Sequence, residues 1–89
     1  MKIKKGFLLS EIDGTGVVVA TGRLSRTFDG MVTLNSTGIF LWKILEMGAP
    51  EGSLAGALVN EYGIDLETAK KDVEDFINTL KGADIIENS

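Results

Sequence analysis

Acidic and basic side chains gather in one stretch of the sequence, KKDVED at positions 70–75. Carboxylates such as Asp72, Glu74 and Asp75 are of the type that ligates a metal ion or works as an acid–base pair. In a helix, Asp72 and Asp75 share a face and Glu74 points elsewhere. Two exposed carboxylates on one helix do not hold a hydrated ion without further oxygen ligands. We therefore expect a solvated helix face and no metal site.

Catalytic groups of other kinds are missing or badly placed. The sequence contains no histidine and no cysteine, which removes the commonest metal ligand, the side chain that titrates near neutral pH, and thiolate chemistry. Lys70 and Lys71 would need burial to act as bases, and their neighbours on the helix are acids. No serine, threonine or lysine lies in a nucleophile elbow or an SxxK pattern. The sequence predicts a protein that is not an enzyme and needs no cofactor.

The charge is unevenly distributed along the chain, whose formal net charge is −4. Five cations against three acids leave residues 1–30 at +2, whereas four lysines against ten acids leave residues 31–89 at −6. A protein that binds nucleic acid must neutralise phosphates, so this balance argues against such a role, most strongly for the second part of the chain. Solvated acidic helix faces are the simpler explanation of the asymmetry.

The composition is that of a globular domain, with 44% hydrophobic and 25% charged residues. Eighty-nine residues leave room for one core, so we expect a single domain over residues 1–89. No apolar run reaches the roughly 18 residues that a membrane span requires. The opening MKIKKGFLL is interrupted by Ser10 and Glu11, and no cleavage site of a signal peptide follows. We expect a soluble cytoplasmic protein that contacts no membrane.

The first third of the chain has the pattern of β-strands. Two apolar runs, residues 6–12 and 17–20, are joined by DGTG, which favours an antiparallel hairpin with Gly14 and Gly16 as turn residues. Residues 21–30 fit either a single helical turn or an anchored loop. The elements that must position any functional side chain therefore begin with a small antiparallel sheet.

The stretch DGMVTLN predicts a turn at Asp29-Gly30, a third strand at residues 31–34 and a helix N-cap at Asn35. Three short strands cannot close into a barrel, so at least one edge keeps unpaired N–H and C=O groups. The segment MVTL contains no charge and no proline to protect an edge, so it is a candidate for binding a peptide as an added strand. The sequence does not fix the strand order, and interior packing of MVTL stays open.

Two helices are predicted between Asn35 and Gly63. The first is apolar around much of its circumference, from Ile39 to Leu45, so it should be central, with Trp42 in the core. We expect it to end at Gly48. The second helix should begin after Pro50, cover roughly residues 51–62 and end at Gly63.

A third helix is predicted from Asp65, its N-cap, to Gly82. Its apolar stripe comprises Leu66, Ala69, Val73, Phe76, Ile77 and Leu80. Ile85-Ile86 is expected to return as a short strand or to cover the core. The second and third helices together have the pattern of a helix-turn-helix unit. Strands followed by helices with short connections predict an α+β fold.

Two segments carry a resemblance to a known family. Leu34 to Trp42, LNSTGIFLW, has the pattern LN-x-TG-x-(apolar)-x-W, and Ala69 to Leu80 has the pattern A-x-x-DV-x-x-F-(apolar)-x-x-L. In this order and spacing the chain resembles, over nearly its whole length, the PqqD family. Its members are small proteins named for coenzyme PQQ synthesis protein D and are also called RiPP recognition elements, after the ribosomally made peptides that they serve.

The resemblance implies a winged helix-turn-helix-like fold, with a three-stranded antiparallel sheet followed by three helices. It also implies a non-catalytic module of natural product biosynthesis, a peptide chaperone. Such a module captures the leader segment of a precursor peptide by strand addition and presents it to a radical-SAM or other peptide-modifying enzyme. In the family, the leader typically lies along the third strand, in a groove against the third helix.

Carried over by position, the docking edge comprises Met31, Val32, Thr33 and Leu34. One side of the third helix that could face it comprises Lys70, Val73, Ile77 and Lys81. The other side comprises Asp72 and Phe76. Both sides include residues of the apolar stripe, and the sequence does not choose between them. The ending KGADII and the glycines Gly52 and Gly56 depart from the family pattern.

Other functions stay open from the sequence. A winged-helix protein that binds nucleic acid is the alternative, because Lys70 and Lys71 lie on the helix that would enter a groove, although four acids lie on the same helix. A structural subunit of a larger assembly is a third possibility. An exposed strand edge also allows a homodimer. The particular precursor peptide and its pathway are not identified by these residues.

Overall fold

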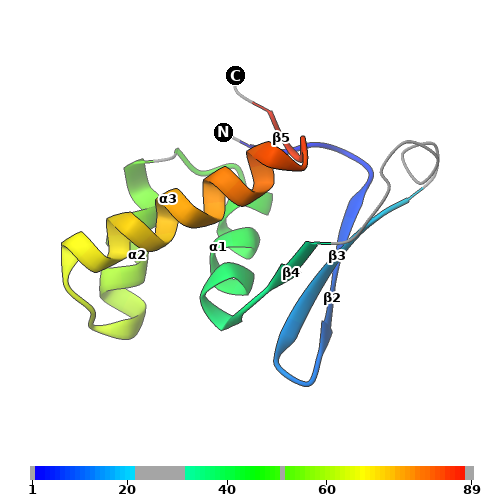
Figure 1. The fold of residues 1–89 in the computed structure, drawn as a ribbon. Helices are drawn as coiled ribbons and strands as arrows, with labels where there is room; N and C mark the ends of the chain where they lie inside the picture. The colour runs from blue at the N-terminus through cyan, green and yellow to red at the C-terminus, as the bar shows by residue number, and fades with distance from the viewer. Residues whose placement is uncertain (1, 22–31, 51, 88–89) are drawn as a thin grey trace.

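The order of elements is β-β-β-β-α-α-α-β in a computed structural model that describes residues 2–21, 32–50 and 52–87. The strands are β1 (Lys2–Ile3), β2 (Phe7–Ile12), β3 (Thr15–Ala20), β4 (Val32–Leu34) and β5 (Ile86–Glu87). The helices are α1 (Ser36–Glu46), α2 (Gly52–Tyr62) and α3 (Leu66–Gly82). Figure 1 shows the β2–β3 hairpin on one side of the molecule and the helices on the other, with β4 leading into α1. The predicted α+β architecture is confirmed.

Strands β2, β3 and β4 form an antiparallel sheet in that order, so β4 is an edge strand. Positive φ angles at Asp13 (52°) and Gly14 (79°) form the turn of the predicted hairpin, as in a type I′ turn. The prediction that Gly16 is a turn residue is wrong, because Gly16 is buried inside β3 opposite Leu34. A Cβ atom on Gly16 would lie 2.7 Å from Cγ1 of Ile39, so glycine lets α1 approach the sheet closely.

Asn35 joins the edge strand to the first helix. Its side-chain oxygen accepts a hydrogen bond of 2.9 Å from the backbone N–H of Gly38, which confirms the predicted N-cap. A Cβ atom on Gly38 would lie 3.1 Å from Cβ of Leu34, so the end of β4 and the first turn of α1 are in close contact. The chain therefore turns from strand to helix within one residue and places β4 beside the start of α1.

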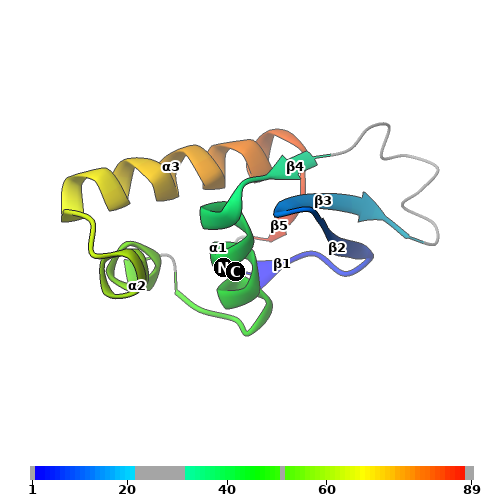
Figure 2. The ribbon, with the colours of Figure 1, turned by 90° about the horizontal axis from the view of Figure 1, so that it is seen from below.

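The second and third helices form the predicted helix-turn-helix pair around Gly63, whose φ is 66°. Asp65 caps α3 by accepting a hydrogen bond of 3.1 Å from the N–H of Thr68. Figure 2 shows α3 running across the molecule from α2 to the side of the sheet, with β4 alongside its C-terminal half. The long third helix thus connects the helical side of the fold to the sheet edge.

Helix α1 lies at the centre of the core, as its sequence predicts (Figure 2). Leu41, Trp42 and Leu45 have no exposed side-chain surface. The indole Nε1 of Trp42 is buried without an acceptor among the residues that the structure describes. The buried apolar residues of all layers form one cluster around this helix, which includes Val18, Leu34, Leu54, Leu58, Val73, Phe76, Ile77 and Leu80.

The two ends of the chain meet in a second small sheet that the sequence did not predict. Strand β1 pairs antiparallel with β5, and Ile3 lies opposite Ile86. The Lys4 Nζ atom lies 2.7 Å from a carboxylate oxygen of Asp84. Ile85 and Ile86 are buried, so the end of the chain is both a strand and a cover for the core. Pairing between residues more than 80 positions apart has no local sequence signal.

Candidate functional site

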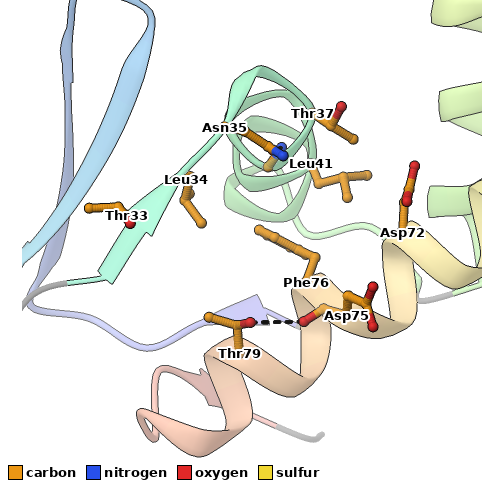
Figure 3. A pocket seen from close by; sticks show the side chains of 10 residues that line it. Thr33, Leu34, Asn35, Thr37, Leu41, Asp72, Asp75, Phe76 and Thr79 are labelled. Carbon is orange, nitrogen blue, oxygen red and sulfur yellow. Dashed lines mark hydrogen bonds between the residues drawn. The ribbon is translucent and has the colours of Figure 1, made fainter.

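A pocket of about 250 Å³ lies between the edge strand β4, the first turn of α1 and the middle of α3 (Figure 3). The described residues that line it are Thr33, Leu34, Asn35, Thr37, Gly38, Leu41, Asp72, Asp75, Phe76 and Thr79. Sequence segments about 40 residues apart therefore meet at this place, because the cap at Asn35 fixes β4 beside α1 and α3 crosses both.

The pocket has an apolar floor and a polar rim. Leu34, Leu41 and Phe76 belong to the buried core and form its floor. The rim consists of hydroxyl, amide and carboxylate side chains: Thr33, Asn35, Thr37, Asp72, Asp75 and Thr79. A pocket of this kind can bury an apolar side chain while polar atoms around it fix the orientation of the bound group.

The exposed edge of β4 borders this pocket. Val32, Thr33 and Leu34 pair with β3 on one side, opposite Val18, Val17 and Gly16. No further strand pairs with β4 within the described parts of the chain. An edge strand presents backbone N–H and C=O groups that can pair with another chain. The combination of this strand edge and an adjoining pocket with an apolar floor is suited to binding an extended peptide.

A second hollow of about 580 Å³ lies between the β1–β2 connection and the C-terminal end of α1. Lys2, Lys4 and Lys5 line it together with Glu46 and Met47. Its described lining includes no residue of α3, so no third helix would flank a strand that was added there. We therefore take the pocket beside β4 as the candidate site.

The family model for coenzyme PQQ synthesis protein D (PqqD) matches residues 15–86. The chain belongs to the PqqD family. The match begins at β3 and includes the helices and both segments that resembled this family in the sequence. The predicted resemblance is confirmed.

Two solved structures are similar to this PqqD-family chain. The structure of TbiB1 in complex with the TbiA(beta) leader peptide is 26% identical in sequence, with a TM-score of 0.80, and the match covers 100% of this chain and 98% of that chain. The structure of lasso peptide synthetase B1 complexed with the leader peptide is 20% identical, with a TM-score of 0.74, and the match covers 98% of this chain and 96% of that chain. The second likeness shows the fold alone. No curated protein matches the sequence.

The structure places most of the predicted docking edge of the PqqD-family chain beside the pocket. Thr33 is exposed, Leu34 is buried, and both line the pocket. Val32 is half-buried and packs against the core from β4. Met31, the turn at Asp29-Gly30 and residues 22–28 lie outside the described residues.

Of the two candidate sides of α3, only one borders the pocket. Asp72 and Phe76 line the pocket, together with Asp75 and Thr79 (Figure 3). The other set, Lys70, Val73, Ile77 and Lys81, is absent from the described lining. Val73 and Ile77 are buried in the core, and the two lysines are exposed. The structure thus brings one side of α3 to β4, although a role of either set in peptide binding stays a prediction.

Sequence reasoning missed the contribution of α1 and the full extent of the α3 side. Thr37, Gly38 and Leu41 line the pocket because they follow directly on β4. Asp75 and Thr79 extend the side of Asp72 and Phe76 at spacings of three and four residues. This spacing is visible in the sequence. It becomes informative once the position of β4 against α3 is known.

Two of the rim groups of the pocket are carboxylates. The carboxylates of Asp72 and Asp75 accept no hydrogen bond from other described residues and form no ion pair with them. The backbone oxygen of Asp75 accepts a hydrogen bond of 2.9 Å from the Thr79 hydroxyl. Among the described residues no group of three or more metal-ligating side chains is close enough to hold an ion.

None of the described helices combines the length and apolarity of a membrane span.

Proposed function

We propose that this PqqD-family chain is a non-catalytic module that captures the leader segment of a ribosomally synthesised precursor peptide. The leader is added as a strand along β4, and its helix-facing side chains enter the pocket in front of α3. The module then presents the peptide to a modifying enzyme, of the radical-SAM or another type. Presentation without chemistry accords with the lack of histidine and cysteine in the sequence.

The observation that carries the proposal is that, among the described residues, one edge of β4 pairs with no strand and lies next to a pocket with an apolar floor. Backbone pairing along the edge supplies affinity, and the pocket selects alternate side chains of the added strand. The similarity to TbiB1, which was solved with a bound leader peptide, supports the same use of this fold. Asp72 and Phe76 are then the side of α3 that we expect to contact the peptide, because both line the pocket, whereas Val73 and Ile77 do not belong to its described lining.

The proposal is tested by titrating the 89-residue chain with leader peptides of precursors encoded beside its gene while backbone amide signals are recorded. We expect the amide signals of Val32, Thr33 and Leu34 to shift on binding. A peptide that binds without perturbing this strand, or the failure of every such leader to bind, would refute capture along β4.

A matched pair of variants separates the pocket from the helix surface in general. Thr79 and Asn78 are both exposed on α3, but of the two Thr79 alone lines the described pocket. Thr79→Trp should fill the pocket and weaken leader binding about tenfold or more, since a few contacts carry most of the affinity of an interface. Asn78→Trp adds the same side chain outside the pocket and should leave the dissociation constant within about twofold.

A further inference from the structure

The charges of the pocket are all of one sign. Its described lining contains two carboxylates, Asp72 and Asp75, and no lysine or arginine. The lysines of α3 at positions 70, 71 and 81 lie outside this lining, and no ion pair between described residues neutralises either carboxylate. The rim of the pocket is therefore a place where a positive side chain of a ligand would find unpaired partners.

The carboxylates lie beside the apolar floor and not within it. Phe76 is 7% exposed and forms the floor, and Asp72 lies four residues before it on the same face of α3. Four residues of an α-helix span about 6 Å along its axis. Asp75 is next to Phe76 in sequence and lines the same pocket. Along the axis of this helix, Asp72 thus lies about 6 Å from the apolar subsite at Phe76, and Asp75 lies between the two positions on the rim of the same pocket.

An added strand has a matching period. Side chains that point to the same face of a strand are two residues apart, which corresponds to about 6.6 Å. Strand β4 and α3 slant in the same direction in both Figure 1 and Figure 2, so a strand added to β4 would run along the helix. Two consecutive helix-facing side chains of such a strand would therefore lie over Phe76 and beside Asp72, respectively.

We infer that the segment captured on β4 carries an apolar side chain and, two residues away, a lysine or arginine that pairs with Asp72 and Asp75. This inference rests on the proposed function and adds the chemistry of its ligand. The apolar side chain fills the floor formed by Leu34, Leu41 and Phe76. The basic side chain fixes the register of the added strand, because a slip by one residue would turn both side chains away from α3.

The test begins with a displayed library of random dodecapeptides that is selected on the wild-type chain. We expect the selected peptides to share an apolar residue and a lysine or arginine two positions apart, in the one order that the strand direction sets. The same selection on the variant Asp72→Asn/Asp75→Asn should lose the basic residue and keep the apolar one. Glu74→Gln is the matched control, since Glu74 is exposed on the same helix and absent from the described lining.

Affinity measurements with one selected peptide and its variants complete the test. Replacing the basic residue of the peptide by glutamate should weaken binding to the wild-type chain about tenfold, and to Asp72→Asn/Asp75→Asn less than about threefold. Glu74→Gln should respond as the wild type does. Circular dichroism and amide spectra establish that each variant is folded.

The outcomes distinguish this inference from the proposal on which it rests. Two results would overturn the inference and leave capture on β4 intact. In one, the selected peptides shift the amide signals of β4 but share no basic residue. In the other, replacing the basic residue by glutamate weakens binding equally for the wild type and all variants. If no selected peptide perturbs β4, capture on β4 fails and the inference fails with it.

Discussion

Asn35 holds the junction between strand and helix through one hydrogen bond, from the Gly38 N–H to its side-chain oxygen. The same residue lines the pocket, next to Leu34 and Thr37. The geometry of the site thus depends on a capping interaction as well as on the residues that contact a ligand. Single polar side chains with local partners are the features at this scale that can be tested one at a time.

Asn35→Ala should lower the free energy of unfolding by about 1 kcal/mol, the usual cost of losing an N-cap acceptor. Urea denaturation of both proteins measures this difference. Asn35→Asp keeps an acceptor at the same place and should remain within about 0.5 kcal/mol of the wild type. Equal losses in the two variants would contradict the capping role, because the aspartate retains the hydrogen bond.

The cap at Asp65 should make the stability of the protein depend on pH. The pKa of its carboxyl is lowered, foremost by the hydrogen bond from the Thr68 hydroxyl and then by that from the Thr68 N–H. A carboxyl whose pKa is lower in the folded state contributes stability that is complete above its unfolded pKa of about 3.9 and is lost as the pH falls through the folded value. We therefore expect acid to weaken this cap.

Asp65→Asn should reduce the loss of Tm between about pH 5 and pH 2, because the amide caps the helix without titrating. Thermal unfolding followed by circular dichroism across this range measures the slope. Glu74→Gln, in the exposed part of the same helix, should keep the wild-type slope. If the dependence of Tm on pH is unchanged in Asp65→Asn but reduced in Glu74→Gln, it arises from the overall charge of the protein and not from this cap.

At the scale of elements, β3 divides its side chains between two environments. Val18 is completely buried against α1, and Val19 is 36% exposed on the opposite face of the sheet. Leu8 and Ile12 of β2 are also exposed on the sheet. The alternation along a strand that is buried on one face explains why adjacent valines should differ in their contribution to stability.

Val18→Ala should destabilise the fold by about 2 kcal/mol, since it removes buried apolar volume from a packed core. Val19→Ala removes the same atoms and lowers the β-propensity by the same amount, but at a partly exposed position. It should therefore lower the free energy of unfolding by less than about 1 kcal/mol. Chemical denaturation of the two variants under identical conditions gives the comparison. Equal destabilisation would show that β-propensity, and not burial, governs the contribution of these two valines to stability.

The elements that could be predicted from the sequence are those with local signals. Asn35 and Asp65 mark helix starts by their capping groups, and Asp13-Gly14 marks the hairpin by the φ angles that it permits. The pairing of β1 with β5 could not be predicted, because it depends on residues at opposite ends of the chain. The prediction for Gly16 was wrong because glycine is needed there to leave room for Ile39, and this close approach is also nonlocal in sequence.

The candidate site was predicted in part for the same reason. The β4 residues Thr33 and Leu34 could be identified, since the family resemblance placed the docking edge there. The side of α3 that faces β4 could not be chosen. Val73, Phe76 and Ile77 form one apolar stripe, and its period shows that the stripe is buried but not which of its flanks borders the sheet edge.

For the whole molecule, the distribution of charge argues against nucleic-acid binding. The net charge is −4, and the lining of the pocket contributes two carboxylates to it. Lys70 and Lys71 are exposed on α3, the helix that would enter a DNA groove in a winged-helix protein. Glu67, Glu74 and Asp75 are exposed on the same helix and oppose the approach of phosphates.

The chain should therefore show no salt-sensitive binding to a short DNA duplex, even at about 0.02 M salt, where electrostatic affinity is strongest. Fluorescence anisotropy of a labelled duplex against the full chain measures it, and Lys70→Glu/Lys71→Glu should give the same flat titration. Binding that weakens steeply with salt in the wild type and disappears in this double variant would instead establish α3 as a DNA-binding helix. A leader peptide that competes with the duplex would then place both ligands on one face of α3. If the chain does not bind DNA, the rim carboxylates would disfavour phosphates for the same electrostatic reason for which we propose that they favour a basic side chain in a peptide.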